Sequence, residues 1–308
     1  MVRSIKAAIG LMLVLLLACG CGPQNTEELY VTPDQTDLPG TGTAEEGIPT
    51  AEPTEEPEHG EPAVGTIASA DRIDMEQLSR IDSSVNGTWS AAWDKNGEPI
   101  FNKGLQEILD KYGAAYIGAR DQKVLYLTFT AGYEEGCTGK ILDVLKKYDI
   151  KASFFILQWY AVSAPELTRR IIDEGHDLGN HTLTHKQLPN VSLETVVSEI
   201  CDMHEYIREN FQYEMLYFRP SYNMFDERAI AAADMAGYKI SLWSFAYRDW
   251  GDDRGTAFAY ESLLNSLHNG CVLNLHATYR SNAEVLERFI QEALSRGYTF
   301  APISQLYS

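Results

Sequence analysis

Apolar and polar residues alternate after residue 123 in blocks of two kinds. Short, nearly continuous apolar runs predict buried strands at 124–130, 152–157, 215–218, 238–244 and 271–275. Segments with apolar residues three or four apart predict helices at 138–148, 164–174, 193–211, 227–236, 260–267 and 283–296. Ser192 is the expected N-cap of the helix over 193–211, and Gly175 is expected to end the helix over 164–174. This alternation predicts an α/β fold with parallel strands and helices outside the sheet.

Side chains suited to proton transfer or metal binding fall at the ends of predicted strands. Thr130, Arg219, Asp249 and His276 are at or shortly after such ends, and His181 and His185 lie between the helices predicted at 164–174 and 193–211. Because the carboxyl ends of parallel strands meet at one edge of such a fold, these residues are expected to share one pocket. Taken alone, His181 and His185 would more often be hydrogen-bonded core histidines, and Arg219 would suit a structural ion pair, for example with Asp249.

The first residues have the pattern of a secretory signal. Arg3 and Lys6 precede an apolar run over 7–18, which ends at Cys19. The run is shorter than the roughly 20 residues that an uncleaved membrane anchor needs. The segment ending at Cys19 resembles a bacterial lipobox, so we expect a signal peptide over 1–18 and lipid attachment at Cys19, with Cys21 as the alternative. This implies a lipoprotein on the outer face of a bacterial cell membrane.

Composition changes sharply after the signal. Residues 22–70 hold seven of the twelve prolines and eleven acidic residues, without Lys or Arg. Such a segment cannot bury enough apolar surface to fold, so residues 19–70 are predicted to form a disordered acidic tether rich in Pro, Thr and Glu. The net charge of −19 argues against nucleic acid as a partner, because that interaction rewards Lys and Arg patches.

The rest of the chain divides into an N-terminal extension over 71–120, expected to pack on the main domain, and that domain over 121–308. Its cysteines (Cys137, Cys201 and Cys271) lack paired spacing and are read as buried thiols, with a disulfide left open. His176 is expected to pack where a helix ends, whereas His204 and His268 are expected on the surface.

Five short motifs occur in an order that carries a family resemblance. They are Thr128-Phe129-x-x-Gly132-Tyr133, His181-x-x-x-His185, Arg219-Pro220-x-Tyr222, Asp249-Trp250 and Leu275-His276. The chain resembles the NodB-type polysaccharide deacetylases (carbohydrate esterase family four) over about residues 86–308. The segment from Gly132 to Thr138, the run Asn282-Ala283-Glu284 and the region from Trp89 to Gly118 are similar to the delta-lactam-biosynthetic (muramic acid) de-N-acetylase branch.

The resemblance implies a deformed, incomplete (β/α) barrel of about seven parallel strands. It also implies metal-dependent removal of acetyl from N-acetylated sugars, with peptidoglycan or a related polysaccharide as partner. Carried over by position, His181 and His185 would hold a divalent metal, zinc in the first instance, with the residue at 131. The residue at 130 would be the base, oriented by Arg219. His276 would be the general acid, Asp249 its partner, and the Tyr222 N–H an oxyanion donor; Trp250, Tyr133 and Leu275 would line the substrate pocket.

Two positions of the family's first motif differ in this chain. Thr130 stands where the family has the base aspartate, and Ala131 where it has the third metal ligand. A threonine hydroxyl is a very weak base at neutral pH, and two imidazoles alone are expected to bind metal weakly or not at all. Glu134 or Glu135 could act as a substitute base.

Three functions therefore stay open. The chain could be a glycan-binding lipoprotein with a degenerate deacetylase pocket, a working de-N-acetylase with an unusual base, or a structural lipoprotein without a glycan ligand. A further hypothesis follows from the missing acids. Arg219 is expected to face the pocket and to bind the lactyl carboxylate of muramic acid through paired hydrogen bonds.

Overall fold

The computed structural model describes residues 68–95, 97–265 and 267–307, and the predicted signal peptide and most of the predicted tether lie outside them. Ala68 is buried and donates its N–H to the carbonyl of Ala236, so the folded part has begun by residue 68, before the predicted end of the tether at 70. Among the described residues, no helix combines the length and apolar character needed to cross a bilayer.

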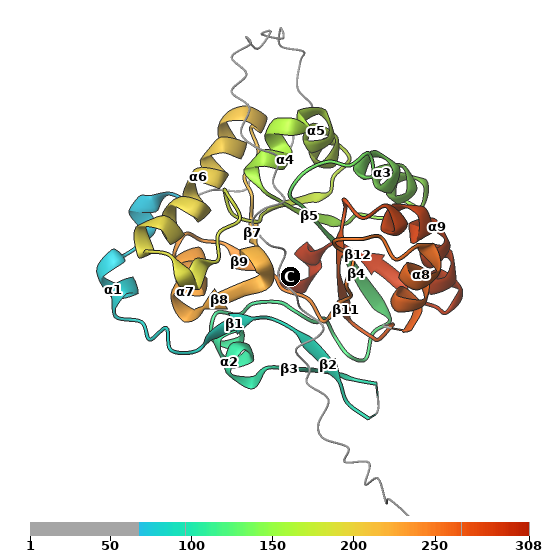
Figure 1. Cartoon of the computed structure of the whole chain (residues 1–308), viewed down its shortest axis with the longest axis horizontal. Coiled ribbons are helices and arrows are strands. Elements are labelled where there is room, and N and C mark those ends of the chain that lie inside the picture. Colours follow the sequence, from blue (N-terminus) through green and yellow to red (C-terminus); the bar gives the residue numbers. More distant parts are fainter. Residues whose placement is uncertain (1–67, 96, 266, 308) are drawn as a thin grey trace, which may run out of the picture. The chain divides into compact units, whose positions relative to one another are not determined.

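A parallel sheet forms the centre of the molecule (Figure 1). Its seven-strand path runs β10, β11, β4, β5, β6, β7, β9, and an eighth strand, β12, pairs with the start of β4. The strands are β4 (Val124–Ala131), β5 (Ser153–Ile156), β6 (Asp177–Asn180), β7 (Tyr217–Phe218), β9 (Lys239–Ile240), β10 (Phe245–Ala246), β11 (Cys271–His276) and β12 (Thr299–Ala301). The path leaves the curled sheet open, which confirms the predicted incomplete barrel of about seven parallel strands.

Helices lie around the outside of this sheet (Figure 1). They are α3 (Thr138–Lys147), α4 (Gln158–Ser163), α5 (Pro165–Asp173), α6 (Leu193–Phe211), α7 (Glu227–Met235), α8 (Thr256–Asn265) and α9 (Arg280–Ser295). The bounds of α6 match the prediction, and the Ser192 hydroxyl accepts the N–H of Thr195 as an N-cap should. β4 is buried along nearly its whole length because it lies between β11 and β5 in the middle of the sheet, and this explains its continuous apolar sequence.

The run predicted as one strand over 238–244 is interrupted. β9 ends at Ile240, and the carbonyls of Ser241 and Leu242 instead accept N–H groups of the Arg219 side chain. Ser241 keeps an isolated parallel bridge with Ala115, and regular pairing resumes at β10. A buried arginine directly after β7 thus binds the carbonyls that follow the end of β9.

β6 was not predicted, because its sequence is mostly polar. Gly179 lies against the ring of Phe155, and a Cβ at this position would come within 2.6 Å of the ring. The absence of a side chain lets β6 approach β5 closely.

The N-terminal extension includes α1 (Met75–Ser79), α2 (Lys103–Lys111) and the strands β1 (Asn86–Thr88), β2 (Ala91–Trp93) and β3 (Pro99–Phe101). β1 pairs antiparallel with β8 (Met224–Asp226), and β2 pairs with β3. Trp89 is fully buried, and its indole N–H donates to the carbonyl of Trp243 over 2.7 Å. These contacts fix the extension next to the segment that follows Arg219.

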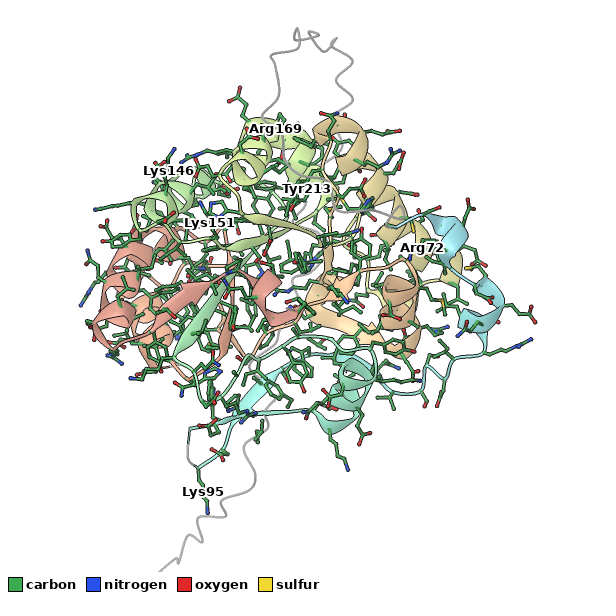
Figure 2. All side chains as sticks on the ribbon, turned by 180° about the vertical axis from the view of Figure 1, so that it is seen from behind. Arg72, Lys95, Lys146, Lys151, Arg169 and Tyr213 are labelled. Carbon is green, nitrogen blue, oxygen red and sulfur yellow. The ribbon has the colours of Figure 1, made fainter. Side chains whose placement is uncertain are left out.

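Basic side chains on the helical side around α3 and α5 already have partners. Lys151 donates to the carbonyl of Glu174, Lys146 lies 3.8 Å from the Glu174 carboxylate, and Arg169 donates to the carbonyl of Phe211 (Figure 2). These contacts connect neighbouring helices to each other and to the segment before β5.

The predictions for the cysteines and for two of the histidines have different outcomes. Cys137, Cys201 and Cys271 are buried and free, as predicted. The surface placement of His204 and His268 is wrong. His204 is hydrogen-bonded to Tyr238 and Glu214 inside the fold, and buried His268 lies outside any helix, bonded to the hydroxyl of Ser244.

Candidate functional site

The loop that carries His181 and His185 begins directly after β6 and is held by buried polar groups. The Asn180 side chain accepts the N–H of Thr182, which has a positive φ of 79°, and this contact turns the chain sharply. The buried carboxylate of Glu199 on α6 accepts the Thr184 N–H and its hydroxyl. A rigid support of this kind keeps the two histidines in a fixed relation.

The two imidazoles face each other, with ring centroids 5.3 Å apart. His181 Nδ1 lies 2.9 Å from the carbonyl of Arg219, which can only accept, so Nδ1 carries the proton and Nε2 keeps its lone pair. Burial, reinforced by His185, lowers the pKa of His181 well below its ordinary value. Burial likewise lowers the pKa of His185 to about 4. Both rings are therefore neutral at pH 7, which is the form that binds metals.

The donor set does not fit a three-ligand metal site. Ala131, at the third position, is 1% exposed and has no donor atom. Within the described ranges, no three His, Cys, Asp or Glu side chains cluster in a way that could hold a metal ion. His181 and His185 therefore supply two neutral imidazoles as the ligands for a metal ion at this position.

The expected base position is part of a hydrogen-bond chain that contains no carboxylate. The Thr130 hydroxyl donates to Oδ1 of Asn274 over 2.9 Å, and the same oxygen accepts Nη1–H of Arg219 over 2.8 Å. Arg219 also donates to the Thr128 hydroxyl over 2.9 Å. Asn274 was not predicted to take part, although a single polar residue inside the apolar run Cys271–His276 is the signal that could have identified it.

Arg219 does not face the pocket as predicted. Its side chain is fully buried, with the guanidinium 4.0 Å from the ring centre of Phe155. Its N–H groups donate to the backbone carbonyls of Ser241 and Leu242 and to the side chains described above. The proposed direct contact with a muramic acid carboxylate is therefore wrong. An ion pair with Asp249 is also wrong, because Asp249 pairs with His276.

His276 and Asp249 form a close pair at the ends of their strands. Nδ1 of His276 lies 2.7 Å from Oδ1 of Asp249, and Oδ2 accepts both the His276 backbone N–H and the amide of Asn282. Burial opposes a charge on the imidazole, but the charge and hydrogen bond of Asp249 outweigh it and raise the pKa of His276. Trp250 packs edge-on to this imidazole, with ring centroids 5.8 Å apart. Asn282 appeared in the sequence motif, but its supporting role is visible only here.

The turn at Tyr222 has the backbone geometry expected of an anion-binding donor. Tyr222 and Asn223 have positive φ values of 56° and 50°, and the Tyr222 N–H makes no hydrogen bond to any described residue. The Asn223 carbonyl accepts the N–H of Trp89, and its side chain accepts the indole N–H of Trp243. The Tyr222 ring lies against His185, with centroids 4.2 Å apart. The N-terminal extension thus supports a strained turn beside the histidines.

The expected pocket wall is only partly as predicted. Tyr133 follows β4 and is 45% exposed, as suits a side chain at a pocket rim. Leu275 is 1% exposed and, by the alternation of β11, lies on the face opposite Asn274 and His276. Leu275 therefore packs in the core, and Asn274 and His276 share the other face of β11.

Comparison with known proteins agrees with this architecture. Residues 117–241 match the model of the polysaccharide deacetylase family. The chain is 35% identical over 211 residues to the peptidoglycan-N-acetylmuramic acid deacetylase PdaA of Bacillus subtilis, covering 68% of this chain and 80% of that protein. The chain belongs to the polysaccharide deacetylase family.

Solved structures extend the comparison. The structure of Bacillus subtilis PdaA, a family 4 carbohydrate esterase, superimposes with a TM-score of 0.70 at 32% identity, covering 74% of this chain and 98% of that one. A family 4 pseudoenzyme from Bacillus anthracis shares the fold with a TM-score of 0.59 over 63% of this chain and 68% of that one, and its 22% identity shows likeness of fold alone. This member of the polysaccharide deacetylase family therefore has the fold of family 4 carbohydrate esterases.

Proposed function

We propose that this polysaccharide deacetylase homologue is a lipid-anchored protein of the bacterial cell surface that binds N-acetylated glycan, with deacetylase activity lost or residual. The family supports peptidoglycan as the glycan, because the relative PdaA is a peptidoglycan-N-acetylmuramic acid deacetylase. The signal-like start and Cys19 support the anchor.

The observation that carries the proposal is an asymmetry within the site. The acid half is complete, because His276 is paired with Asp249 and held by Asn282. The other half presents Thr130 and Ala131, neither of which can remove a proton from water or complete a metal site. Amide hydrolysis needs both halves, since water must be activated while the leaving amine is protonated. Loss of a general base typically costs about 10²–10⁴-fold in rate.

One of the two candidate substitute bases, Glu134, already has hydrogen-bond partners. Glu134 accepts the N–H and the hydroxyl of Thr138, so its carboxylate caps the start of α3 and is already in use. Glu135 is exposed and keeps the alternative of an active de-N-acetylase open. The intact His276–Asp249 pair favours either of these functions over a purely structural lipoprotein.

Binding and hydrolysis can be separated experimentally. The purified chain without its signal is titrated with N-acetylated glycan oligomers and muropeptides, and amine release is followed with and without Zn²⁺. The proposal expects saturable binding with little or no amine release. Rapid amine release would establish the active enzyme instead, and absence of both would leave the structural lipoprotein. For the anchor, Cys19→Ala should release the protein from the membrane fraction.

A further inference from the structure

We propose that the side-chain amide of Asn274 is the hydrogen-bond donor at the pocket floor and binds a carbonyl-type oxygen of the glycan ligand. This inference rests on the proposed glycan-binding function and names one of its contacts. The relevant oxygen belongs either to the acetamide of an N-acetyl sugar or to a sugar carboxylate. Both present the same acceptor chemistry.

The orientation of the Asn274 amide is fixed by its neighbour. Oδ1 accepts Nη1–H of Arg219 over 2.8 Å and the Thr130 hydroxyl over 2.9 Å. Because a guanidinium can only donate, the oxygen must point toward Arg219. Nδ2, with its two N–H groups, must then point away from this chain.

Nδ2 has no partner among the described residues, although Asn274 is only 2% exposed. The described buried polar atoms that are sealed from solvent without a partner belong to Tyr160, Glu174 and His176. The small exposed part of Asn274 therefore includes Nδ2, so this donor reaches open space. A buried donor of this kind favours a ligand that supplies the missing acceptor.

The direction of the opening follows from β11. Asn274 and His276 are two residues apart on the same strand, so their side chains lie on one face of the sheet. Thr130, paired with His276 across β4 and β11, borders the same space. The N–H groups of Nδ2 therefore lie on the face of β11 that also carries His276, deeper in the fold than that imidazole.

Electrostatics favours an oxygen acceptor there. Arg219 polarises the Asn274 amide through Oδ1, and hydrogen bonds in such a chain strengthen one another. The nearest acid of the site, Asp249, is bonded to His276 and Asn282 and does not occupy this position. The family's base position thus borders a donor that can hold a carbonyl oxygen.

Asn274→Asp is the matched test, because it keeps an oxygen toward Arg219 and Thr130 and replaces the donating NH₂ with a carboxylate oxygen that can only accept. Calorimetry would compare tri-N-acetylchitotriose, its fully deacetylated counterpart and sodium acetate. For the wild type we expect the acetylated trimer to bind better than the deacetylated one. The variant should bind the acetylated trimer about tenfold more weakly. The deacetylated trimer should lose no affinity, because its protonated amines are attracted to the added carboxylate. If the acetylated trimer is unaffected and the uncharged variant Asn274→Leu also loses acetate binding, the contact is with a carboxylate.

A measurement on the unaltered protein tests the same contact even if the variant does not fold. The side-chain amide resonances of Asn274, assigned by NMR, should shift on addition of the acetylated trimer and not of the deacetylated one. If the wild type binds the trimer while these resonances and the variant's affinity stay unchanged, the Asn274 inference is overturned and the proposed function stands. If the wild type binds no glycan, the proposed function itself fails, and this contact fails with it.

Discussion

Nδ1 of His276 lies 2.7 Å from Oδ1 of Asp249, and the other carboxylate oxygen accepts the backbone N–H of the same histidine. This double contact fixes the ring and stabilises its protonated form. A histidine held in this way can act as a general acid, whereas the opposite side of the site presents Thr130 and Ala131.

Replacing Asp249 should therefore change the protonation of His276. In Asp249→Asn the negative charge is removed, so the pKa of His276 should fall and the proton should leave at a lower pH than in the wild type. NMR titration of the imidazole resonances measures this directly. Asp253→Asn is the matched control, because Asp253 caps α9 through Ser281 and should leave the pKa of His276 unchanged. Equal titration curves for Asp249→Asn and wild type would contradict the assigned pairing.

Metal affinity should reflect the missing third ligand. His181 and His185 supply two imidazoles, and Ala131 supplies nothing, so Zn²⁺ should bind weakly to the unaltered protein. Ala131→Asp should tighten binding clearly in calorimetry, and His181→Ala in that background should remove the gain. Tight stoichiometric zinc in the unaltered protein would contradict the two-ligand description.

Protein stability should fall as the solution is acidified below pH 6.5. Burial lowers the pKa of His176 to about 4, and its Nδ1 accepts the N–H of Ala152, so the folded state keeps this ring neutral. The unfolded chain takes up a proton near pH 6.5, so this stabilisation is present above that pH and is lost toward pH 4. His181 and His185 act in the same direction, whereas the raised pKa of His276 acts oppositely, its contribution being lost as pH rises.

Denaturant unfolding of the metal-free protein between pH 4.5 and 7.5 measures this slope. His176→Gln should start less stable at pH 7, because the ring packed against Phe154 is lost, and should depend less steeply on pH. An unchanged slope in that variant would show that His176 titrates alike in the folded and unfolded chain.

An exposed tryptophan beside the site should contribute to glycan affinity. Trp159 lies in the first turn of α4, directly after β5, and is 53% exposed. Aromatic faces stack on sugar rings, so Trp159→Ala should weaken binding of glycan trimers or longer chains roughly two- to tenfold. Thermal stability should be unaffected. Leu294→Ala, at a 43% exposed position near the end of α9, is the control that should bind normally. Equal affinity in both variants would remove Trp159 from the glycan-binding surface.

Sequence patterns predicted the parts of this molecule that local chemistry determines. The helix over 193–211, its Ser192 cap and the central strand from Val124 follow from periodicity and burial. β6 was not predicted, because its polar sequence forms a strand only where Gly179 fits against Phe155.

The candidate site was likewise predicted only as far as local sequence determines it. Strand ends predicted which residues would meet, but not that Arg219 would be enclosed or that Asn274 would join it to Thr130 through hydrogen bonds. That arrangement depends on how β9 ends and on hydrogen bonds between residues far apart in the chain.

Amine release from N-acetylated glycan by Thr130→Asp/Ala131→Asp, measured beside the wild type with Zn²⁺ present, tests the central claim most directly. The account predicts little or no release by the wild type and a gain of about 10²–10⁴-fold in the double variant, abolished again by His276→Ala. Wild-type release as fast as that of the double variant would contradict the claim that the altered centre has lost the base.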